Sequence, residues 1–129
     1  AMTDPKLVTL CLDTGHAEYG GASSVELIEK YPERIGYLHL KQVHPDTLAK
    51  VRAEDMTFKD ATAAGVMCEP PNGLPDLREV IEAAETLDRP LYGIVEQDMY
   101  PVASFDDPLP IASRTCKYLL SCGARTVVA

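Results

Sequence analysis

The chain of 129 residues has no tryptophan, two phenylalanines, three histidines and few basic residues. Twelve lysines and arginines stand against twenty aspartates and glutamates, which gives a net charge of −8. A nucleic-acid surface needs clustered lysine and arginine to neutralise phosphates. The acidic balance, without any basic stripe, therefore argues against a nucleic-acid partner.

Long hydrophobic runs are also missing. Apolar runs such as residues 7–12 fall far short of the roughly 20 residues that a membrane span requires. Residues 1–6 show no charged-then-apolar signal pattern, so we expect a cytoplasmic protein with no membrane partner. No C-x-x-C pair occurs, and we expect buried free thiols in a reducing cytoplasm, with a disulfide pair as the alternative. The cysteines are Cys11, Cys68, Cys116 and Cys122.

The composition that remains is ordinary for a soluble globular protein, with 46% apolar and 25% charged residues. The length suits one domain, residues 1–129. Three short apolar runs, at residues 7–12, 35–40 and 91–96, predict strands. The first is nearly continuous, which is typical of a strand buried on both faces in a parallel sheet.

Helix signals lie between these strands. Ser23 and Glu26 form a capping box that predicts a helix up to about Tyr31, ended by Pro32. Two shorter helical pieces are predicted at residues 47–54 and 58–64, inside a long connection over residues 41–75 whose length suggests a functional loop. Glycines at 15, 20 and 21 predict a loop after the first strand.

The last two helices have clear starting signals. Asp76 and Glu79 form a second capping box, and Pro110 begins a helix that continues to Gly123. The helix after Asp76 carries one apolar stripe at spacings of three and four, composed of Leu77, Val80, Ile81, Ala84 and Leu87. Alternation of strands and helices predicts an α/β fold with parallel strands joined by right-handed crossovers.

Each predicted strand ends in a residue that can bind a metal: Asp13, His39 and Glu96. Parallel strands end at one edge, so these side chains can converge on one point. One imidazole and two carboxylates suit Mn²⁺, Co²⁺, Zn²⁺ or Mg²⁺, and the nitrogen favours the first three. Such an ion could polarise a carbonyl and stabilise an enediolate while a carboxylate moves the neighbouring proton. The alternative for each residue is structural, with the aspartate as a helix cap and the histidine as a hydrogen-bonded core or surface residue.

Three segments together resemble a known family. They are L-C-L-D-T-G-H at residues 10–16, H-L-K at 39–41 and V-E-Q-D-M-Y-P at 95–101. They resemble the C-terminal half of xylose-isomerase-like TIM barrels, most closely the inosose dehydratase and sugar isomerase/epimerase branch. The resemblance covers residues 7 to about 123. It implies a partial TIM (β/α)8 barrel of about three C-terminal βα units.

In that family a Glu, an Asp, a His and a Glu at the ends of the fifth to eighth strands hold one divalent ion. The resemblance makes Asp13 the sixth-strand ligand, His39 the seventh and Glu96 the eighth. It also makes Glu96 a catalytic residue in proton transfer, and His16 and Lys41 substrate-binding residues. Mn²⁺ or Co²⁺ is the expected cofactor, with Mg²⁺ or Zn²⁺ as alternatives.

Two departures from the family pattern stand out. Many relatives have H-L-K-D where this chain has Gln42 after H-L-K, so the role of an acid at that position is lost or moved. The fifth-strand glutamate has no counterpart, and three strands cannot close a barrel of eight. The chain is therefore expected to be a fragment. Its open strand edges predict a homo-oligomer or a rearranged, strand-exchanged assembly.

The resemblance implies a metal-dependent lyase that dehydrates a keto-inositol through an enediolate, acting on a small polyol or keto-sugar. Two alternatives stay open, a divalent-metal-dependent sugar isomerase/epimerase and a non-catalytic oligomerising fragment. An endonuclease-IV-like phosphodiesterase is disfavoured, because three histidines and an acidic charge do not suit several metals and a basic groove.

Overall fold

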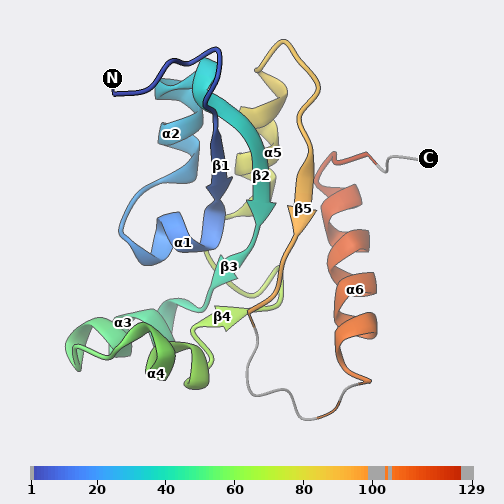
Figure 1. Ribbon diagram of the computed structural model, residues 1–129. Coiled ribbons are helices and arrows are strands. Elements are labelled where there is room, and N and C mark those ends of the chain that lie inside the picture. Colours follow the sequence, from blue (N-terminus) through green and yellow to red (C-terminus); the bar gives the residue numbers. More distant parts are fainter. Residues whose placement is uncertain (1, 99–103, 105, 126–129) are drawn as a thin grey trace.

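A computed structural model describes residues 2–98, 104 and 106–125. Its centre is a parallel sheet of order β1-β2-β5, formed by β1 (Leu10–Asp13), β2 (Ile35–Leu40) and β5 (Gly93–Val95) (Figure 1). All three arrows point the same way, so the strands end at one edge (Figure 1). The α/β fold class with parallel strands is confirmed, and the arrangement is consistent with part of a TIM barrel.

Helices α2 (Ser24–Lys30) and α5 (Leu77–Glu85) pack against one face of the sheet, and α6 (Pro108–Ser121) lies beside β5 (Figure 1). The short 3₁₀ turn η1 (Pro32–Arg34) joins α2 to β2. The main core lies between this helical layer and the sheet. It consists of Leu12, Ile28, Ile35, Leu38, Leu40, Leu77, Val80, Ile81, Ala83, Leu87, Leu119 and Cys122. Burial of this apolar surface is the main stabilising contribution to the fold.

The capping signals confirm the predicted helix starts. The Ser23 hydroxyl accepts a hydrogen bond from the Glu26 N–H at 3.2 Å, and α2 ends before Pro32. The Asp76 carboxylate accepts from the Arg78 N–H at 2.9 Å at the start of α5. Each cap satisfies one backbone donor that a helix start leaves free. Helix α6 begins at Pro108, two residues before the predicted Pro110.

The prediction of a strand at residues 7–12, buried on both faces, is wrong in extent and in burial. Strand β1 begins at Leu10, and Leu7 is 82% exposed. Of the four β1 residues only Leu12 is buried. The reason is that Leu12 packs into the core with residues of α2 and α5, whereas the other β1 side chains are not covered in this way. Among the described residues β1 also pairs with β2 alone, so it is an edge strand.

The loop predicted after the first strand is mostly a helix, α1 (Thr14–Tyr19). Gly15 lies inside this helix. A Cβ at this position would come within 2.8 Å of the Lys41 side chain, which explains why a glycine is found here. The glycine therefore permits close packing of α1 against Lys41 and does not mark a turn. Only Gly20 and Gly21 end the helix, and Gly21 has a positive φ of 83°.

Residues 42–68 form a separate small unit. The two predicted helical pieces are α3 (Pro45–Ala53) and α4 (Phe58–Ala63). An unpredicted antiparallel pair, β3 (Gln42–Val43) with β4 (Met67–Cys68), brackets them. A second core cluster fills this unit, formed by Val43, Leu48, Val51, Ala61, Val66 and Met67.

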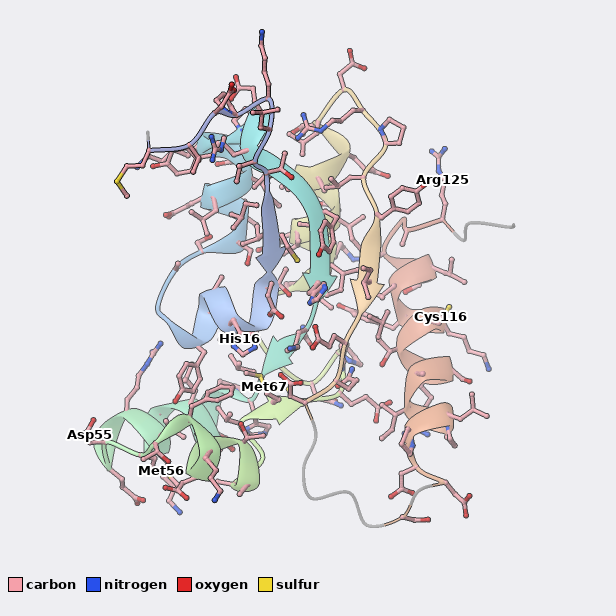
Figure 2. All side chains as sticks on the ribbon, viewed as in Figure 1. His16, Asp55, Met56, Met67, Cys116 and Arg125 are labelled. Carbon is pink, nitrogen blue, oxygen red and sulfur yellow. The ribbon has the colours of Figure 1, made fainter. Side chains whose placement is uncertain are left out.

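The four cysteines are free, as predicted, but they are not all buried. Cys122 is buried, Cys11 and Cys68 are half-buried, and Cys116 is exposed on α6 (Figure 2). Within the described part of the chain, no helix has the length and apolarity needed to span a membrane.

Candidate metal centre

Asp13, His39 and Glu96 converge where the three strands end. One ligand atom from each lies within 4.8 Å of the other two. The His39 Nδ1 atom is 3.6 Å from Asp13 Oδ2 and in contact with Glu96 Oε2. The structure thus brings together the three residues that were predicted from the sequence to converge. Their role as metal ligands stays a prediction.

The sheet register explains this convergence. Asp13 pairs with His39 across β1 and β2, and His39 pairs with Ile94, two residues before Glu96. Side chains alternate between the two faces of a strand. Leu38 and Leu40 on β2 are buried toward the helices, so His39 points to the opposite, open face.

Asp13 acts through both of its carboxylate oxygens. Its Oδ1 accepts a hydrogen bond from the His16 N–H at 2.9 Å and caps α1, whereas Oδ2 faces His39 and Lys41. The structural alternative considered for an aspartate after a strand is therefore correct for one oxygen. The other oxygen remains available as a ligand.

The donor set fits a divalent ion. Glu96 Oε2 is buried and accepts no hydrogen bond within the described ranges, although it touches the His39 imidazole. A buried carboxylate oxygen without a hydrogen bond is costly, and a cation shared with the imidazole nitrogen beside it would satisfy both atoms. One nitrogen and two carboxylate oxygens match the preferences of Mn²⁺, Co²⁺ and Zn²⁺.

Lys41 is buried, with 1% of its side chain exposed, and it is not a solvated charge at the rim. Its Nζ donates to Asp98 Oδ2 at 2.7 Å and lies 3.1 Å from Asp13 Oδ2 and 3.5 Å from Glu96 Oε1. Burial acts to lower the pKa of Lys41, but the hydrogen bonds to Asp98 and Asp13 outweigh it and the pKa is raised. The group is therefore an ammonium ion facing three carboxylates.

The backbone of Lys41 is fixed by Thr14, which is fully buried. The Thr14 hydroxyl donates to the Lys41 carbonyl at 2.6 Å and accepts from the Lys41 N–H at 2.9 Å. These two bonds join the start of α1 to the end of β2. The packing of Gly15 against the lysine stem completes the same contact.

His16 lies on α1, beside the cluster (Figure 2). Its side chain is 45% exposed, and Nε2 is 3.6 Å from Asp98 Oδ2 and 4.0 Å from Asp13 Oδ2. Its ring packs on Phe58 of α4 with a centroid distance of 5.3 Å. This position leaves the imidazole accessible to a ligand, as the predicted substrate-binding role requires.

Asp98 is the site residue that sequence reasoning missed. It is three residues beyond β5, in a stretch rich in aspartate and proline, where no periodicity distinguishes one acid from another. The only available signal was its place in the V-E-Q-D segment. In the structure it contacts both Lys41 and His16.

Gln42 stands where many relatives of the resembled family have an acid, and it has a structural task. Its side-chain amide donates to the carbonyls of Gly73 at 2.9 Å and Pro75 at 2.6 Å, and its oxygen accepts from the Gly73 N–H at 3.2 Å. A carboxylate could not make the two donations. Gln42 therefore holds the loop before α5 in place, and the acids beside Lys41 are Asp13, Glu96 and Asp98.

The fold and the site together define a parallel α/β protein with a cluster of candidate metal ligands at the carboxyl ends of its strands, as in TIM-barrel enzymes. The chain is related to the inosose dehydratases. It is 40% identical over 103 residues to an inosose dehydratase of Geobacillus kaustophilus, covering 80% of the chain and 33% of that protein. It is 34% identical over 122 residues to that of Geobacillus thermodenitrificans, covering 94% of the chain and 40% of the relative.

An inosose dehydratase of Clostridium botulinum is 31% identical over 119 residues, which is 92% of the chain and 39% of that protein. The resemblance to inosose dehydratases inferred from the sequence is thereby confirmed. The chain spans about a third to two fifths of the length of these relatives. No family model matches it.

Proposed function

We propose that this chain supplies three ligands of the divalent-metal site of a lyase, which dehydrates a keto-inositol through an enediolate. One observation carries the proposal. Three neighbouring parallel strands place Asp13, His39 and Glu96 with ligand atoms within 4.8 Å, in a chain related to inosose dehydratases. Mn²⁺ or Co²⁺ is the preferred ion, with Mg²⁺ or Zn²⁺ as alternatives.

The ion would polarise the substrate carbonyl and stabilise the negative charge that develops beside it. The chain's own residues have separate tasks. Glu96 is 39% exposed on its side chain, so its carboxylate can reach a substrate proton and move it. The half-exposed His16 imidazole binds a substrate hydroxyl, and the Lys41 ammonium, held nearby, offers a charged donor.

The proton that Glu96 removes is the one next to the carbonyl, and loss of hydroxide from the neighbouring carbon then completes the dehydration. A ketose epimerase or aldose–ketose isomerase would share the first step and return the proton to a different position or face. The distinction between these activities therefore lies in the fate of the hydroxyl group.

Calorimetric titration with Mn²⁺ and Co²⁺ tests the metal site directly. His39→Gln removes the imidazole and should abolish binding. His44→Asn is the matched control, because His44 caps α3 through Nδ1 and asparagine is also a good cap. Absence of binding by the unmodified chain at millimolar metal, or equal binding by the His39→Gln variant, would refute the metal assignment.

Activity is measured by following the unsaturated product of inosose, with the metal added and with it removed by a chelator. A panel of ketoses is assayed in parallel. Turnover of ketoses without dehydration of inosose would replace the lyase by the isomerase or epimerase. Metal-independent dehydration would retain the lyase and remove the ion from its mechanism.

A further inference from the structure

Lys41 is surrounded by more negative charge than it can balance alone. Asp13, Glu96 and Asp98 bring three negative charges within 3.5 Å of one ammonium ion, and the lysine is 1% exposed. Two of these carboxylates belong to the candidate metal ligands and the third does not. Because the lysine is buried, leaving its charge without a partner would be costly.

A divalent ion on Asp13, Glu96 and the His39 imidazole would balance the charges of the two ligand carboxylates. Asp13 and Glu96 would then no longer compensate the positive charge of Lys41. Asp98 alone would remain for it, and their Nζ–Oδ2 contact, at 2.7 Å, is the shortest of the three. The three negative charges of the carboxylates thus match the combined positive charge of one divalent ion and one lysine.

From this geometry we infer that Asp98 is a positioning residue: it retains the Lys41 ammonium so that the lysine does not compete with the metal for Asp13 and Glu96. The part of this inference that concerns competition with the metal rests on the proposed function. The other part, that Asp98 holds Lys41, concerns the chain without any ion.

The position of Asp98 supports this task. It lies next to Lys41 and not within the ligand set, and its Oδ2 is also 3.6 Å from His16 Nε2. One carboxylate oxygen therefore faces both residues that the family resemblance assigns to substrate binding. Removing its charge should release Lys41 toward Asp13 and Glu96, 3.1 and 3.5 Å away.

The first test is a double-mutant cycle on the metal-free chain, using Asp98→Asn, Lys41→Met and the double variant. Urea unfolding followed by circular dichroism gives the unfolding constant of each. The factor by which Asp98→Asn changes the unfolding constant should differ at least about fivefold between the chain with Lys41 and the Lys41→Met variant, as for residues in one charge network. A smaller coupling overturns the inference, whatever the metal does. Asp88→Asn is the control, since Asp88 is an exposed acid before the opposite end of β5.

The second test measures the Mn²⁺ dissociation constant of the unmodified chain, the two single variants and the double variant. Asp98→Asn should weaken binding about tenfold or more, because the released lysine then competes for the ligand carboxylates. In the Lys41→Met background the same substitution should change binding by less than about threefold. Equal weakening in both backgrounds would mean that Asp98 acts otherwise than through Lys41, and would overturn the inference.

The two failures can be told apart. If the unmodified chain binds no Mn²⁺ at millimolar concentration, the proposed function fails and the metal-free cycle alone decides whether Asp98 retains Lys41. If the unmodified chain binds Mn²⁺ and the cycle shows no coupling, the proposed function stands and the inference fails.

Discussion

Replacing Thr14 by valine should destabilise the protein strongly, although the two side chains have nearly the same shape. The Thr14 hydroxyl makes two buried hydrogen bonds to the backbone of Lys41, at 2.6 and 2.9 Å. Valine would leave one carbonyl and one N–H of Lys41 buried and unsatisfied. At about 1–3 kcal/mol for each orphaned group, the loss is about 2–6 kcal/mol. That is a large part of the stability of an ordinary domain, which is about 5–15 kcal/mol.

Thr115→Val is the matched comparison. Thr115 on α6 is also fully buried, but its hydroxyl has no hydrogen-bond partner among the described residues. Valine there removes an unsatisfied polar atom without changing the shape, so the variant should be as stable as the parent or more stable.

Urea unfolding, monitored by far-ultraviolet circular dichroism, measures both variants. With a slope of about 1–2 kcal/mol per molar urea, the Thr14→Val midpoint should fall by more than about 1 M. The Thr115→Val midpoint should stay or rise. Equal decreases in the two midpoints would refute the reasoning, since burial alone would then account for both.

Three further predictions concern the surface and the thiols. Hydrogen bonding to Arg114 lowers the pKa of Glu69, so the pair stabilises the fold above the ordinary glutamate pKa and loses this effect as pH falls through the lowered pKa. Glu69→Gln should therefore be slightly less stable than the parent in unfolding experiments at neutral pH and equally stable in acid; a pH-independent difference would contradict this. Burial raises the pKa of Cys68 to about 11, so a thiol reagent at pH 8 should modify the exposed Cys116 first and Cys68 only slowly, and the reverse order by mass spectrometry would contradict this. The open sheet face exposes Ile94 at 47%, so light scattering should show a mass above 14.1 kDa that Ile94→Lys reduces to the monomer, whereas a monomeric parent at micromolar concentration would remove the predicted self-association.

The convergence of the ligands could be predicted from the sequence because it depends on few rules. Each apolar run has one side chain that can bind a metal at or next to its C-terminal end, and parallel strands end at one edge. The positions of Asp13, His39 and Glu96 follow from the two-residue period and the direction of the strands. These are local features that read directly from residue order.

Features that depend on contacts distant in sequence were not predictable. Gly15 resembled a loop glycine, because nothing near it in the sequence shows that Lys41 packs against it. Asp98 resembled the neighbouring loop acids, because its role depends on a lysine 57 residues earlier. The pair β3–β4 has two residues per strand, too few for any periodicity.

The shared use of Asp13 has a consequence for how the site is assembled. Because the N–H of His16 anchors one oxygen, the side chain is already oriented when folding ends. Its second oxygen then needs no rotamer search, and an arriving ion encounters little loss of side-chain freedom at this position. The same anchoring ties the ligand to the beginning of a helix, so a substitution that removes the negative charge but keeps the capping oxygen, such as Asp13→Asn, would separate coordination from folding.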